Sequence, residues 1–177
     1  VVVDDFDSAY HATSHLIQLQ CKNIVLLSTI PNLSVGKLRY EGYEKALTDA
    51  GRGIDEHLVI IETSTEVFDE KLKTLMASNT IDAVFALDEH SATAAHKIAL
   101  KQGIKIPDHL NIIGFADGVW SRRLTPSLST VSQHAPEIGA KAAELLIHKL
   151  NVNDEFYQPQ TVVIKTELRK RESTRKI

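Results

Sequence analysis

The feature that most constrains this chain is an alternation of short apolar runs with segments of helical periodicity. The apolar runs are Ile24–Leu27, Leu58–Ile61, Ala83–Leu87 and Asn111–Phe115. The segments between them repeat apolar residues at three- and four-residue spacing, as in a helix with one buried face. Strands that alternate with helices pair in parallel through right-handed crossovers. The sequence therefore predicts an α/β fold with a doubly wound parallel sheet.

The two ends of the chain depart from this alternation. Val1–Val3 predicts a strand at the very start. After residue 118 the pattern predicts a short strand at Leu128–Val131, a long amphipathic helix over about 136–150 and a last strand at Val162–Lys165. The end of the chain, Arg169–Lys176, is rich in basic residues, and we expect it to be a solvated tail.

The composition is that of an ordinary globular domain. With 177 residues, 43% of them hydrophobic and 24% charged, the chain is long enough to bury a sizeable core. No apolar run approaches the roughly 18 residues of a membrane-spanning helix, so we expect no membrane association. The net charge of −3 gives no reason to expect nucleic-acid binding by this chain. The single cysteine, Cys21, excludes an internal disulfide and suits a reducing, cytoplasmic compartment.

Polar side chains follow the predicted strands at their carboxyl ends. Ser64, Asp88 and Asp117 each come shortly after a strand, and Arg39 lies one turn into a helix that follows another. These strand ends meet at one edge of a parallel sheet, where open α/β sheets bind ligands. Carboxylates accept hydrogen bonds and arginine donates two at once, so the set suits a hydroxyl-rich ligand such as a sugar. The alternative is that Asp88 only caps its helix and Asp117 only stabilises a turn.

Signals for catalysis or metal binding are weak. His11 and His15 lie four residues apart on a predicted helix, but the segment lacks the glutamate that a zinc hydrolase uses as its base. The sequence contains no Gly-x-Ser-x-Gly elbow and no phosphate-binding glycine-rich loop. We therefore expect no catalytic residues, no metal and no cofactor.

Several motifs, in order along the chain, resemble one known family. Lys37–Tyr43 resembles an Arg-x-x-Gly-Tyr helix start, and Ile81–Glu89 resembles a DAIFAxND strand and loop. Ile112–Asp117, together with Pro126–Gln133, resembles an IIGFDD…PxLTTVxQ pattern. Thr166–Thr174 resembles a closing TELxxRxST motif. This is the pattern of the effector-binding domains of the lactose/galactose repressor (LacI/GalR) family, and it covers nearly the whole chain. The resemblance implies a periplasmic-binding-protein-like type I fold, in which two α/β subdomains flank a cleft.

The resemblance also implies how the chain is divided. It makes residues 1–177 a fragment of such a domain, with 1–4 as a crossing strand, 5–133 as the C-terminal subdomain, 134–159 as a helix and loop of the N-terminal subdomain, and 160–177 as the returning strand and tail. The chain opens on Val1 rather than methionine, and we expect a DNA-binding helix-turn-helix to lie upstream of it. The apolar face from Ile138 to Leu146 would then lack its partner. The family's homodimer contacts would fall on residues 89–102 and 118–124.

The family's ligand contacts carry over unevenly. Arg39, Asp88 and Gln133 match ligand-contacting positions, but Ala116 stands where the family has an aspartate, which leaves Asp117. No aromatic residue lies near Ser64, where several relatives place one.

The resemblance implies the sensing and dimerising part of a transcriptional regulator, without catalytic activity. Its small-molecule effector, a carbohydrate, would favour one orientation of the two subdomains. Two alternatives remain: a periplasmic sugar-binding transport receptor and an enzyme on the same sheet.

Overall fold

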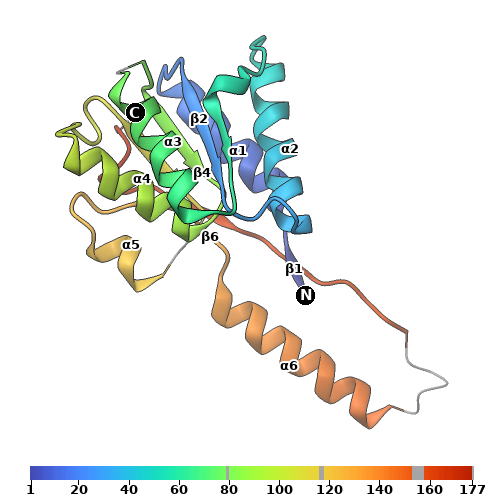
Figure 1. Ribbon diagram of the computed structural model, residues 1–177. Helices are drawn as coiled ribbons and strands as arrows, with labels where there is room; N and C mark the ends of the chain where they lie inside the picture. Colours follow the sequence, from blue (N-terminus) through green and yellow to red (C-terminus); the bar gives the residue numbers. More distant parts are fainter. Residues whose placement is uncertain (79, 116–117, 153–157, 177) are drawn as a thin grey trace.

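A six-stranded sheet forms the centre of the molecule in a computed structural model that describes residues 1–78, 80–115, 118–152 and 158–176. The strand order is β3-β2-β4-β5-β6-β8. All neighbours are parallel except β6 and β8, which are antiparallel (Figure 1). The strands are β2 (Ile24–Ser28), β3 (Val59–Ile61), β4 (Ala83–Ala86), β5 (Asn111–Gly114), β6 (Ser129–Ser132) and β8 (Glu167–Arg169). The predicted α/β class and doubly wound parallel sheet are confirmed.

Helices cover both faces of this sheet. α1 (Asp5–Gln18) and α2 (Ser34–Asp49) pack on one face, and α3 (Thr65–Ala77) and α4 (Glu89–Lys101) pack on the other. Successive strand residues point to opposite faces, so each central strand contributes to two core layers. Leu26, Phe85 and Ile113 belong to the layer under α1 and α2, whereas Val25, Val84 and Ile112 belong to the layer under α3 and α4. Burial on both faces explains why these strands read as continuous apolar runs.

Local signals set the ends of the helices. The carboxylate of Asp88 accepts the backbone N–H of Ser91 at 2.8 Å and caps α4. Gly51 and Gly103 follow α2 and α4 with φ of +70° and +71°. Both helices therefore end where only a residue without a side chain turns easily into the left-handed region.

Three features of the C-terminal third differ from the sequence-based expectation. A short helix, α5 (Val119–Arg123), and the strand β8 were not predicted. The expectation of a solvated tail is wrong, because Ser173 is 0% exposed and Thr174 is 3% exposed. The Ser173 hydroxyl donates to the Ile112 carbonyl at 2.6 Å, and the Ser173 N–H donates to the Ser127 carbonyl at 2.9 Å. These bonds tie the tail to the amino ends of β5 and β6.

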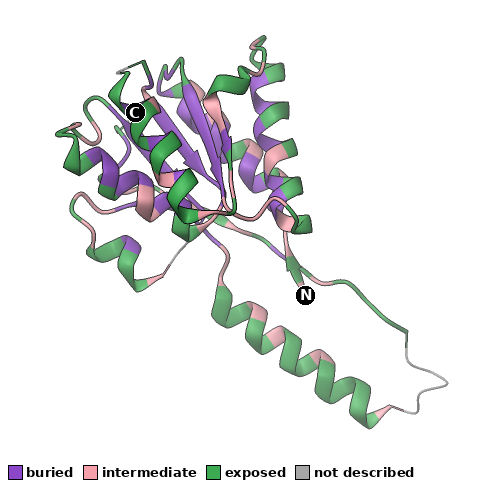
Figure 2. Ribbon diagram, in the orientation of Figure 1, coloured by how far each residue is buried: buried purple, intermediate pink, exposed green. Residues whose placement is uncertain are grey.

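Two elements lie outside the body of the molecule. β1 (Val2–Val3) and β7 (Val163–Ile164) pair in a separate two-stranded parallel ribbon. The helix α6 (Ala135–Asn151) extends away from the sheet, and none of its residues is buried (Figure 2). Leu146 is 57% exposed and Leu150 is 76% exposed, so the apolar face of α6 has no partner in the described part of the chain. None of the described helices combines the length and the apolar character needed to cross a membrane.

Candidate ligand-binding site

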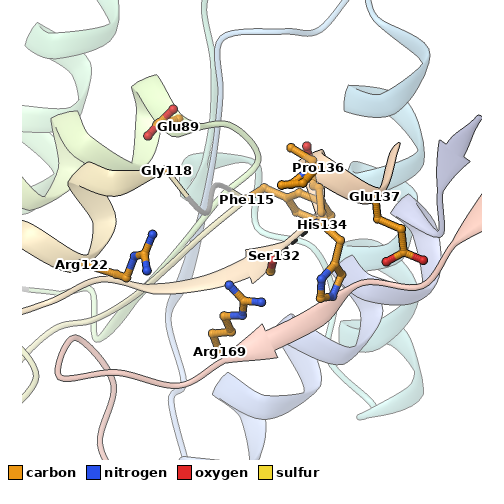
Figure 3. A pocket seen from close by; sticks show the side chains of 11 residues that line it. Glu89, Phe115, Gly118, Arg122, Ser132, His134, Pro136, Glu137 and Arg169 are labelled. Atoms are coloured by element: carbon orange, nitrogen blue, oxygen red, sulfur yellow. Dashed lines mark hydrogen bonds between the residues drawn. The ribbon is translucent and has the colours of Figure 1, made fainter. Parts of the chain in front are cut away.

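A pocket of about 700 Å³ opens where β5 and β6 end, between α4, α5 and the start of α6 (Figure 3). Open parallel sheets place their ligand sites at such strand ends. The wall combines the apolar Phe115 with charged and hydrogen-bonding side chains, which suits a polar ligand with an apolar face. The lining residues are Glu89, Phe115, Gly118, Arg122, Ser132, Gln133, His134, Ala135, Pro136, Glu137 and Arg169.

Gln133 lies in this pocket. It directly follows β6 and precedes His134, whose backbone is left-handed with φ of +51° where the chain turns into α6. Gln133 therefore sits at the connection between the sheet and the helix that leaves it. Of the predicted site residues that the structure describes, it is the one that lines the pocket wall.

Arg39 lies behind the pocket wall rather than at its mouth. Its exposed fraction is only 5%, and its Nε donates to Asp5 Oδ1 at 2.7 Å in a buried ion pair. Its Nη1 donates to the Leu87 carbonyl at 2.6 Å, and its guanidinium carbon lies 3.6 Å from the centroid of the Phe115 ring. The arginine thus touches the ligand pocket through Phe115, by a cation–π contact.

Asp88 is held by the protein itself. Its Oδ2 accepts the Thr29 N–H at 2.8 Å, and its Oδ1 accepts the Thr29 hydroxyl at 3.0 Å in addition to the Ser91 N–H. The capping role is therefore confirmed, and the carboxylate is fixed between the ends of β2 and β4. Its further role as a ligand contact stays a prediction.

Ser64 is not among the residues that line the pocket. Ser64 caps α3 by accepting the Val67 N–H at 3.5 Å, and it follows β3, which lies at the opposite edge of the parallel part of the sheet from β6. Asp117 lies outside the described residues, as does Ala116.

The sequence did not single out Arg122, Glu137 or Arg169, three charged residues that line the pocket. Arg122 comes from α5 and Arg169 from β8, two elements that were not predicted, and both side chains border the pocket in Figure 3. Glu89 and Glu137 come from the first turns of α4 and α6. Arg169 also pairs with Glu167 at 3.0 Å. The site therefore presents cations and carboxylates together, which suits a ligand with both donors and acceptors. Among the described residues no group of three or more His, Cys, Asp or Glu side chains is placed to hold a metal ion.

The comparison with known families agrees with the fold. The sequence pattern of the periplasmic binding protein-like domain matches residues 13–174. The chain is 37% identical over 142 residues to the HTH-type transcriptional regulator DegA of Bacillus subtilis (strain 168), which covers 80% of this chain and 42% of that protein. It is 31% identical over 175 residues to the HTH-type transcriptional regulator MalR of Clostridium butyricum, covering 98% of this chain and 51% of that one. The chain thus spans about half the length of the curated relatives it matches.

Solved structures of regulators share the fold. A complex of the transcriptional regulator CelR with cellobiose superposes with a TM-score of 0.86 at 26% identity, over 97% of this chain and 52% of that chain. A LacI-family transcriptional regulator from Enterococcus faecium with bound ribose superposes with a TM-score of 0.84 at 24% identity, over 97% of this chain and 63% of that chain, which bears on the fold alone. The resemblance to the effector-binding domains of LacI-type regulators, read from the sequence motifs, is confirmed.

Proposed function

Because this chain belongs to the family of periplasmic binding protein-like domains, we propose that it is the effector-sensing and dimerising part of a LacI-type transcriptional regulator. The effector is a small carbohydrate or carbohydrate derivative that binds where β5 and β6 end. The protein contacts DNA through a helix-turn-helix domain outside this chain. It acts in the cytoplasm. The domain binds and releases its ligand without transforming it.

The observation that carries this proposal is the position of the pocket. It lies at the carboxyl ends of parallel strands, beside the point where Gln133 leads into α6. Two solved regulators that share the fold have cellobiose and ribose bound. A pocket with Phe115 on one side and charged donors and acceptors on the other provides the contacts that a sugar ring needs.

The elements outside the body fit a second subdomain. We assign the β1–β7 ribbon to the strands that cross between subdomains and α6 to the subdomain on the far side of the pocket. The exposed apolar residues of α6, Leu146 and Leu150, would then be covered by that subdomain. Ligand bound between the two bodies would favour one relative orientation of them, and the same orientation would change how a dimer presents its DNA-binding domains.

A surface on α4 and α5 suits the homodimer contact. Val119 is 52% exposed and Trp120 is 66% exposed at the start of α5, and Leu100 is 47% exposed near the C-terminal end of α4. An exposed tryptophan beside an aliphatic residue is typical of an interface centre. The two helices lie at one side of the body, away from α1 and α2 (Figure 1).

The test is ligand binding by the full-length protein, measured by isothermal titration calorimetry with cellobiose, ribose and a panel of common mono- and disaccharides. We expect one of these sugars to bind, and Gln133→Ala to weaken its binding by about tenfold or more, or about 1.4 kcal/mol. Gln102→Ala is the matched control, because Gln102 lies at the far end of α4 and binds the Lys73 carbonyl at 2.9 Å. Equal loss in both variants, or no binding of any sugar, would overturn the proposal.

A further inference from the structure

Two adjacent aspartates join the β1–β7 ribbon to the body, and each faces a different partner. Asp4 Oδ1 accepts the Thr166 N–H at 2.9 Å, and Asp4 Oδ2 pairs with Lys165 Nζ at 3.2 Å, next to the end of β7. Asp5, the first residue of α1, pairs with Arg39 of α2. The junction between β1 and α1 is therefore bonded to the ribbon on one side and to the body on the other.

Arg39 extends this connection to the pocket. Its guanidinium is fixed at the same time by Asp5, by the Leu87 carbonyl and by the face of Phe115. Leu87 follows β4 and Phe115 follows β5, and Phe115 lines the pocket. A displacement of either strand end must therefore move the guanidinium or break one of its contacts.

Burial makes separation of the Asp5–Arg39 pair costly. Asp5 is 3% exposed and Arg39 is 5% exposed. Burial raises the pKa of the Asp5 carboxyl, and the positive charge of Arg39 opposes this shift. A buried charge that loses its partner is costly, because water does not replace the lost contact. Asp5 consequently follows Arg39 when the guanidinium moves, whereas a surface pair would separate freely.

We propose that Asp5 is a positioning residue that couples the pocket residue Phe115 and the end of β4 at Leu87, through Arg39, to the order of the β1–β7 ribbon. A ligand that shifts Phe115 displaces Asp5 through Arg39. The displacement then reaches Asp4 and its hydrogen bond with the Thr166 N–H. The coupling is built into the chain without ligand. It depends on the proposed function only for the identity of the molecule that shifts Phe115.

Hydrogen exchange of backbone amides, followed by NMR on the 177-residue chain, tests this coupling without any sugar. In Asp5→Ala and in Arg39→Gln, the Thr166 amide should exchange about tenfold faster or more, together with the amides of β4 and β5, which exchange through global unfolding and report the stability lost with the buried pair. Asp5→Asn keeps an acceptor oxygen for Arg39 and should restore most of the protection of Thr166. The double variant Asp5→Ala/Arg39→Gln should add little to either single change, because both remove the same contact.

Tyr43→Phe is the matched control. Tyr43 is also buried on α2, but its hydroxyl donates to the Ile24 carbonyl at 2.8 Å and not to Asp5. Its loss should leave the Thr166 amide unchanged. The proposal is overturned if Thr166 exchanges at its original rate in Asp5→Ala, if it accelerates as much in Tyr43→Phe as in Asp5→Ala, or if the two single effects add. Where the alanine variant does not fold, the comparison of Arg39→Gln with Tyr43→Phe decides in the same way. Failure of sugar binding would count against the proposed function and not against this coupling.

Discussion

The chain contains two amphipathic helices, α1 and α6, of which only α1 has its apolar face buried. α1 buries Ala9, Ala12 and Leu16 completely against the sheet. α6 has the same kind of apolar spacing, yet it extends from the body with Leu146 and Leu150 exposed (Figures 1 and 2). Periodicity therefore predicts that a helix has a face to bury, and the rest of the fold decides whether that face is covered.

The comparison also separates two sources of helix stability. In α1 the buried face supplies most of it, as in helices of globular proteins generally. α6 depends on its composition, which is rich in alanine, leucine, lysine and glutamate, and on Pro136 in its first turn. Substitutions in the body should therefore change the free energy of unfolding far more than equivalent substitutions in α6.

Removal of an ion pair should give the largest difference in the free energy of unfolding between the body and α6. Arg39→Met leaves Asp5 buried without a cation, and we expect it to lower the free energy of unfolding by about 3–5 kcal/mol. Lys141→Met in α6 removes the exposed pair with Glu144, and the change should stay within about 0.5 kcal/mol. Urea unfolding of both variants measures the difference. A cost below about 1 kcal/mol for Arg39→Met would show that Asp5 is not dependent on its partner.

Identical leucine substitutions should give the next contrast. Leu26 in β2 is 0% exposed, and Leu26→Ala should cost about 2–5 kcal/mol through lost burial and the cavity left behind. Leu146 is 57% exposed, and Leu146→Ala should stay within about 0.5 kcal/mol. Both values come from the same urea titrations. A cost of about 2 kcal/mol or more at Leu146 would mean that α6 packs against another surface in solution, such as a second copy of the chain.

The body was largely predictable because its signals are local. The strands around Leu26, Phe85 and Ile113 are short apolar runs between turn residues, and the cap at Asp88 is encoded within a few positions of α4. The misread tail shows the opposite case. Ser173 and Thr174 are polar and look solvated, but their burial depends on bonds to Ile112 and Ser129, which are distant in sequence. Periodicity carries no information about such partners.

The position of the pocket was predictable, and its lining was not. The rule that ligands bind at the carboxyl ends of parallel strands pointed to the rim of the sheet, where the pocket lies, and the family resemblance named Gln133, which lines it. The burial of Arg39 was missed, because it depends on Asp5, which precedes it by a whole strand and helix. Arg122 and Arg169 were missed because they lie on α5 and β8, elements too short to leave a periodic pattern.

Glycine-to-alanine substitutions should give the smallest difference in the free energy of unfolding between the body and α6. The two substitutions should change this free energy in opposite directions. At Gly42 in α2 an added methyl group would overlap the Phe6 carbonyl oxygen and lie 2.9 Å from Ala9 Cβ, where α1 and α2 pack closely. Gly42→Ala should therefore cost about 1–3 kcal/mol in urea unfolding. At Gly139 in α6 an added methyl group has no neighbour within 4 Å among the described residues. Gly139→Ala should instead favour the helix by about 0.5–1 kcal/mol, because glycine loses more backbone freedom than alanine when a helix forms.

Far-UV circular dichroism separates the two glycine substitutions further. Gly139→Ala should raise the helical signal and delay its thermal loss, with little change in the unfolding of the sheet, since α6 melts without a packed partner. Gly42→Ala should lower the midpoint of the common unfolding transition without raising the helical signal. If Gly139→Ala instead lowered the stability of the whole chain, α6 would have to approach another backbone closely at that position. The contrast between a packed α1 and an unpartnered α6 would then not hold in solution.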